Sequence, residues 1–157
     1  KSLFDLSRPP VRQHLRVGET VVLTMAEPLV GDGWHEREGG IHAACRWAGP
    51  QRCSSLYFAV VPDGTFEVTL WLSSVISDEV LAGLVVSING VPAAHLITAQ
   101  AGFQVVTASV SLHDADATCL HVELAFFQTA SAWETAGVAD HRQKTVAVER
   151  VEVRKRG

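Results

Sequence analysis

Two stretches of the sequence gather the side chains that could bind a polar ligand. The first runs from Gly33 to Trp47 (GWHEREGGIHAACRW) and combines two indole rings, two glutamates and two arginines with three glycines. The second is ADHR, residues 139–142, which places Asp140 two residues before Arg142. Sugar-binding sites use an aromatic ring as a platform for the apolar face of a pyranose, and nearby polar groups bind its hydroxyls. Neither stretch is a complete catalytic set.

Three tryptophans and three charged residues are therefore candidates for a carbohydrate-binding site: Trp34, Trp71, Trp133, Glu38, Asp140 and Arg142. Two structural alternatives stay open. Glu38 and Arg142 could instead form a buried or half-buried ion pair between the long loop and the last strand, in which case Arg142→Ala would cost about 3 kcal/mol or more. Asp140 could accept backbone N–H groups and fix a turn. Each indole could equally anchor a core or a corner.

Side chains of metal-binding types lie together in three places: His35, Glu36 and His42; His121 and Glu123; and Asp114 and Asp116. Imidazole and carboxylate would suit a transition metal at the first two, and an oxygen-rich turn would suit calcium at the third. Seven histidines scattered over 157 residues place such neighbours together by chance. We predict no metal and no other cofactor.

Catalytic motifs are missing from the sequence. It contains no GxSxG elbow, no HExxH, no phosphate-binding P-loop and no GxGxxG after a strand-like run. A hydrolase with paired carboxylates could be assembled from Glu38 with Glu36 or Asp140, but sequence spacing does not give the separation of carboxylates in space. We therefore expect no catalytic residues and a non-catalytic protein.

Length and charge limit the classes of protein. The 157 residues, 47% of them hydrophobic, suffice for one domain with its own core. The net charge of -4 disfavours nucleic-acid binding, which depends on clustered basic residues. The basic run at 154–156 indicates a solvated tail. No stretch of about 18 apolar residues predicts a membrane span. No cleavable signal is recognised, and we expect a cytoplasmic location.

Cysteine usage favours reduced thiols. Cys45, Cys53 and Cys119 form no CxxC spacing, and we expect them to be reduced and buried as small hydrophobes. A disulfide between Cys45 and Cys53, which flank the turn at 48–50, remains the alternative.

Hydrophobic periodicity predicts an antiparallel β-sandwich. Residues 66–72 alternate, with Phe66, Val68, Leu70 and Leu72 on one face and Trp71 among the polar residues of the other. We expect further strands at 17–25, 41–47, 56–61, 103–112, 119–127 and 145–153. Asn89-Gly90 predicts a two-residue hairpin turn between 84–88 and the residues from Val91 onward. A helical turn is expected only at 77–84. Segment 1–16 would lead into a jelly-roll-like single domain over 17–157.

Three motifs follow one another along the chain: Gly33-Trp34 with Glu38 and Trp47, then VSING at 86–90, then ASAWETAGVADHR at 130–142. Their order resembles that of a β-sandwich accessory domain of bacterial glycosyltransferases and surface-polysaccharide biosynthesis proteins. The resemblance spans about Val17 to Val153. Ala132 stands where the family has proline, and Gln143-Lys144 stands where it has Leu-Gly.

The resemblance implies a non-catalytic, carbohydrate-binding-like module. Its partners would be a glycan or polysaccharide and a glycosyltransferase domain, which could lie in the same chain because the sequence begins at Lys1 rather than Met. The alternative is a protein–protein docking or oligomerisation domain without a glycan ligand, in which the same aromatic residues are interface anchors.

Overall fold

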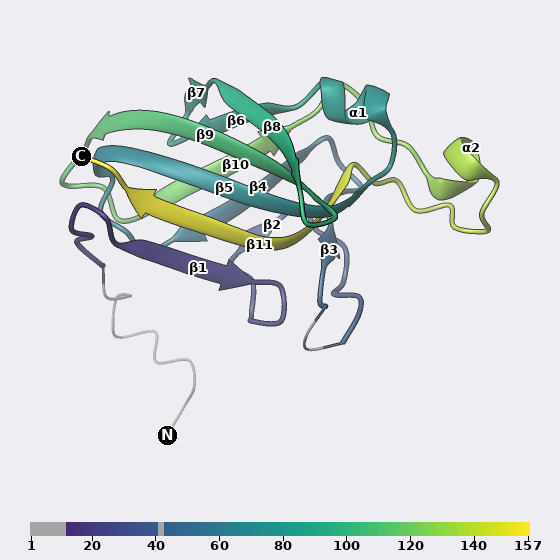
Figure 1. Ribbon diagram of the computed structural model, residues 1–157, viewed down its shortest axis with the longest axis horizontal. Coiled ribbons are helices and arrows are strands. Elements are labelled where there is room, and N and C mark those ends of the chain that lie inside the picture. Colours follow the sequence, from purple (N-terminus) through teal and green to yellow (C-terminus); the bar gives the residue numbers. More distant parts are fainter. Residues whose placement is uncertain (1–11, 41–42) are drawn as a thin grey trace.

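The computed structural model describes residues 12–40 and 43–157, which form two antiparallel β-sheets packed face to face (Figure 1). The six-stranded sheet comprises β1 (Thr20–Thr24), β11 (Val146–Lys155), β5 (Asp63–Val75), β9 (Phe103–His113) and β8 (His95–Gln100) in spatial order, with β3 (Arg46–Trp47) also paired to β11. The five-stranded sheet comprises β2 (Gly31–Asp32), β4 (Cys53–Phe58), β10 (Leu120–Ala125), β6 (Val85–Ile88) and β7 (Val91–Ala93).

The strand order is that of a jelly roll. The order β1-β11-β5-β9 in one sheet faces β4-β10-β6-β7 in the other, and every strand pair is antiparallel. Consecutive strands alternate between the sheets except in the hairpins β6–β7 and β8–β9, an arrangement typical of a jelly roll built from two Greek keys. The predicted all-β, jelly-roll-like single domain is confirmed.

The core lies between the sheets and follows the alternation in the sequence. Phe66, Val68, Leu70 and Leu72 of β5 are at most 1% exposed, and Leu120, Val122 and Leu124 of β10 meet them from the other sheet as part of the same core cluster. Removing these apolar side chains from water supplies the main force that holds the sheets together. The predicted inward face of β5 is confirmed.

The predicted hairpin turn is also confirmed, but the strand after it differs from expectation. Asn89 and Gly90 have φ values of 49° and 78°, the positive values that a type I′ turn requires. The following strand β7 ends at Ala93, and the chain then crosses to the six-stranded sheet as β8. The sequence predicts no boundary between these strands, because the chain between them carries no clear turn signal.

Two short helices connect strands. The helix α1 (Asp78–Ala82) lies within the helical turn expected at 77–84, and Ser77 caps it by accepting a hydrogen bond from the Val80 amide. The second helix, α2 (Ala132–Ala136), was not expected, so the prediction of a single helical turn is wrong. It lies beyond the end of the sandwich, on the excursion that leads into β11 (Figure 1).

Other boundaries differ locally from the sequence-based expectations. The strand expected at 41–47 is reduced to the two residues of β3, and Ile41 and His42 lie outside the described residues. Strand β4 begins at Cys53 rather than at Leu56. Residues 1–11 of the N-terminal segment are likewise outside the described part. Its residue Gln13 exchanges backbone hydrogen bonds with Ala59 and Val61, and Leu15 is buried in the core. No described helix is long and apolar enough to cross a bilayer.

Candidate functional site

Residues 33–49 form an arm that follows β2 of the five-stranded sheet and includes β3 of the six-stranded sheet. This arm carries the first group of candidate residues. Backbone bridges Trp34–Ala48 and Glu38–Cys45 hold its two sides together, and residues 41–42 lie outside the described residues. Gly33 anchors its base: the Gly33 carbonyl accepts from the Ser54 hydroxyl at 2.6 Å, and its φ of +81° suits glycine. The arm therefore projects Glu38 from a fixed base.

An excursion formed by residues 130–144 carries the second group. Ala130 and Lys144 close its base through two backbone hydrogen bonds of 3.0 and 2.8 Å. Ser131 and Glu134 form a capping box at the start of α2, and Gly137 ends the helix in the left-handed conformation. Hydrogen bonds from Gln143 and then from Ser131 lower the pKa of Glu134. The pattern S-x-x-E followed by glycine was the sequence signal for this helix, and we missed it.

Arg142 joins the excursion to the arm. Its Nη1 donates to Oε2 of Glu38 at 3.0 Å, and its Nε and Nη2 donate to the two carboxylate oxygens of Asp140 at 3.0 and 2.7 Å. The predicted contact between Glu38 and Arg142 is thus present. It is not buried, since the two side chains are 41% and 42% exposed. Solvent screens such a pair, so the expected cost of about 3 kcal/mol for Arg142→Ala is too large.

Asp140 is the centre of this charged cluster. Its Oδ1 also accepts from the backbone N–H of Arg142 at 3.1 Å, which is the turn-fixing role considered for it. Lys144 donates to its Oδ2 at 2.7 Å. The hydrogen bonds from Arg142, followed by those from Lys144, hold the pKa of Asp140 far below its usual value of 3.8. The hydrogen bond to Asp140 in turn raises the pKa of Arg142.

Lys144 belongs to the site and was not among the predicted residues. Its side chain is 5% exposed, and its ammonium lies 4.6 Å from the ring centroid of Trp47. A buried ammonium requires a counter-charge, and Asp140 provides it, while the indole adds a cation–π contact. Its i, i+4 spacing from Asp140 was a weak signal, because nothing in the sequence placed Trp47 beside it.

Trp133 presents an open aromatic surface next to this cluster. It lies on α2, its side chain remains 52% exposed, and its backbone N–H donates to the Asp140 carbonyl at 3.0 Å. Its ring packs against His141 with centroids 5.1 Å apart and planes tilted by 35°. The fold thus brings Trp133, Asp140, Arg142 and Glu38 to one end of the molecule.

Trp34 and Trp71 lie elsewhere and have structural partners. Trp34 packs partly buried against the core, and its Nε1 donates to the Ser55 carbonyl at 2.9 Å. Trp71 lies on the outer face of the six-stranded sheet, where its Nε1 donates to Glu152 at 2.8 Å. The guanidinium of Arg150 covers its ring at 4.3 Å. Neither tryptophan joins the cluster around Arg142.

The cysteines are unpaired, and one expectation about them is wrong. No disulfide joins Cys45 to Cys53, and Cys119 is also free. We expected buried thiols, but Cys53 is exposed and the other two cysteines are only partly buried. Partial burial raises the pKa of the Cys45 thiol.

Within residues 12–40 and 43–157, no three His, Cys, Asp or Glu side chains are placed to hold a metal ion. The candidate ligand His42 lies outside these residues. Asp114, considered for calcium, accepts a hydrogen bond from the Ala117 amide at 3.1 Å and so caps the turn after β9.

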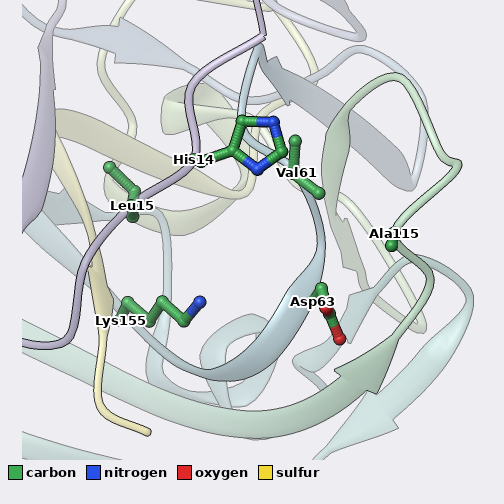
Figure 2. Close-up of a pocket in the computed structure, with 6 residues that line it drawn as sticks. All are labelled: His14, Leu15, Val61, Asp63, Ala115 and Lys155. Carbon is green, nitrogen blue, oxygen red and sulfur yellow. The ribbon is translucent and has the colours of Figure 1, made fainter.

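A pocket of about 160 Å³ lies beside Lys155, the last residue of β11 (Figure 2). Its lining comprises His14, Leu15, Val61, Asp63, Ala115 and Lys155. The ammonium of Lys155 extends toward the space between these side chains, whereas Asp63 turns its carboxylate away. None of the six predicted site residues lines this pocket. A more apolar groove of about 340 Å³ lies beside Tyr57 and Cys119, also without a predicted residue.

The chain was compared with protein-family models and with curated protein sequences. No protein-family model matches this chain, and no curated protein sequence matches it.

Proposed function

We propose that the protein is a non-catalytic, carbohydrate-binding-like module that works with a bacterial glycosyltransferase of cell-surface glycan synthesis. The ligand in this proposal is a glycan or polysaccharide, and the glycosyltransferase is a domain of the same chain or a separate partner. In this proposal the protein uses no cofactor, binds no nucleic acid and is located in the cytoplasm. It takes its enzyme association from the sequence resemblance described above.

The observation that supports glycan binding is the half-exposed indole of Trp133 beside the charged cluster of Glu38, Asp140 and Arg142. An exposed ring offers a stacking surface for a pyranose, and flanking polar groups can bind hydroxyls. The helix that carries Trp133 is capped at both ends, so the backbone that presents the ring is ordered before a ligand arrives.

The charged residues divide into positioning and binding roles. Both oxygens of Asp140 already accept hydrogen bonds from Arg142 and Lys144, so Asp140 orients the guanidinium. Arg142 has five N–H donors, and its described hydrogen bonds to Asp140 and Glu38 use three of them. We assign the two remaining donors, with His141, to ligand hydroxyls.

A bacterial-glycan array with the wild-type chain tests the proposal. Trp133→Ala removes the proposed platform, while Trp71→Ala removes an indole of the sheet face and serves as the matched control. Saturable binding to one glycan class that is lost in Trp133→Ala and retained in Trp71→Ala supports the site. Loss only in Trp71→Ala would move the site to the sheet face. Absence of binding to every surface polysaccharide would overturn glycan binding.

The second candidate is a protein-docking domain without a glycan ligand. The observation that favours it is three exposed apolar side chains on the segment between β10 and β11: Phe127 at 76%, Trp133 at 52% and Val138 at 55%. Apolar residues gathered on one segment are typical of a protein interface. Under this alternative, Phe127→Ala and Val138→Ala weaken the association with the glycosyltransferase. If Trp133 instead binds a glycan, both variants should keep that association.

A further inference from the structure

The sheet edges of this molecule are not equally protected. In the five-stranded sheet, the edge strand β2 has two residues, and the edge strand β7 has three with Pro92 in the middle. In the six-stranded sheet, β1 has five residues and is preceded by the charged residue Glu19. Short length, proline and charge are the usual means of preventing edge-to-edge association.

The remaining edge strand, β8, has none of these protections. Its six residues, HLITAQ, include no proline, lysine, arginine, aspartate or glutamate. Five of the six are exposed, with Leu96 at 74% and Ile97 at 37%. One side of β8 pairs with β9 over its whole length, and no other described strand pairs with the other side. This side therefore presents a row of backbone donors and acceptors for pairing.

We propose that β8 is a dimerisation edge that pairs antiparallel with β8 of a second copy of this chain. A two-fold axis would join the two six-stranded sheets into one continuous sheet. This interface goes beyond the proposed glycan site, because no residue of β8 belongs to the cluster around Arg142. It also differs from the docking alternative, whose apolar residues lie on the segment between β10 and β11.

The geometry of antiparallel pairing fits a second copy. In an antiparallel pair, two directly opposite residues either exchange both backbone hydrogen bonds or exchange none. A two-fold axis therefore lies between a residue and its own copy in the partner, and near the middle of β8 this residue is Thr98 or Ile97. About Thr98, Leu96 faces the partner's Gln100 and Ile97 faces the partner's Ala99. About Ile97, Leu96 faces the partner's Thr98.

Both registers are compatible with the side chains of β8. Neither places two ionised carboxylates or ammonium groups opposite one another, and Thr–Thr and apolar cross-strand pairs stabilise a sheet. A different polypeptide would be selected by charge or by side-chain pockets along the edge, and β8 offers no charged residue for such selection. Self-pairing needs neither, because each copy brings a strand of the same length and polarity and the symmetry closes at two copies.

Sedimentation velocity of the 157-residue chain, from micromolar to near-millimolar concentration, tests the proposal. We expect the sedimentation coefficient to rise with concentration to that of a dimer. Thr98→Lys places two ammonium groups at or beside the axis and should weaken dimerisation at least tenfold. The matched control is Val22→Lys, an exposed position on β1 at the opposite edge of the same sheet, which should leave dimerisation unchanged. A monomer at all concentrations, or an equally stable dimer in Thr98→Lys, would overturn the proposal.

Hydrogen exchange of the wild-type chain keeps the proposal testable if Thr98→Lys does not fold. Amides of alternate β8 residues point away from β9, and their exchange should slow as concentration rises, whereas β1 amides should not change. Equal exchange of β8 amides at all concentrations would contradict the dimer. No glycan is present in either experiment, so their outcomes are independent of the glycan proposal.

Discussion

Arg142 holds Glu38 at 3.0 Å and Asp140 at 2.7 Å at the same time, although Glu38 lies 104 residues earlier in the chain. The guanidinium of Arg142 therefore links the arm to the excursion before β11, in addition to the contact of Lys144 with Trp47. Lys144 strengthens the same point from the interior by its own 2.7 Å contact with Asp140. The position of Trp133 depends on this link, because its backbone is hydrogen-bonded to Asp140.

The coupling between Glu38 and Arg142 should be small. Both side chains are about two-fifths exposed, and exposed ion pairs contribute about 0.2–1 kcal/mol. A double-mutant cycle with Glu38→Gln and Arg142→Gln, measured by urea unfolding, should give a coupling energy in that range, reduced at high salt. A coupling of about 3 kcal/mol would show that the pair is desolvated in solution.

Asp140 should make stability depend on acid pH. Its pKa is lowered in the folded chain, so its contribution is complete well above its usual value of 3.8 and is lost progressively as pH falls below that value. Urea unfolding of wild type and Asp140→Asn should therefore differ most near neutral pH, with the difference decreasing below about pH 4. The same difference at pH 7 and at pH 2.5 would exclude ionised Asp140 as its source.

Removing the cap of α2 should loosen the helix that carries Trp133. Ser131→Ala deletes the acceptor for the Glu134 amide and should destabilise the helix by about 1 kcal/mol. The emission of Trp133, obtained as the difference between chains with and without Trp133→Phe, should then respond to urea at lower concentration than the strand signal in circular dichroism. Ser131→Thr keeps the hydroxyl and is the control, because its two transitions should stay as close as in wild type.

One identical substitution at two sites tests the jelly-roll core. Leu70→Ala in β5 opens space between the sheets, where Leu70 is 1% exposed, and should cost about 2–5 kcal/mol. Leu96→Ala removes the same atoms from a side chain that is 74% exposed, and the folded monomer should lose less than about 0.5 kcal/mol. Unfolding should be measured at dilute concentration, and similar losses at both sites would contradict the assigned burial.

Local patterns in the sequence determined most of the strands. The alternation at 66–72 was sufficient because only one face of that strand can be buried when side chains point alternately to opposite faces. Asn89-Gly90 determined a hairpin because few other residue pairs adopt two successive positive φ values at low cost. The S-x-x-E pattern at 131–134 was equally local, and it would have predicted α2 had the capping box been recognised.

Long-range packing decided what those elements bring together. The sequence allowed Glu38 to meet Arg142, but the burial of the pair depends on how far the arm and the excursion project from the sheets. Likewise, three tryptophans had equal chemistry in the sequence, and only the tertiary structure gave Trp34 and Trp71 hydrogen-bonded partners while leaving Trp133 open. Residue type and spacing determine which face of a strand is apolar. The contacts of a side chain depend on strands distant in sequence, which no local periodicity specifies.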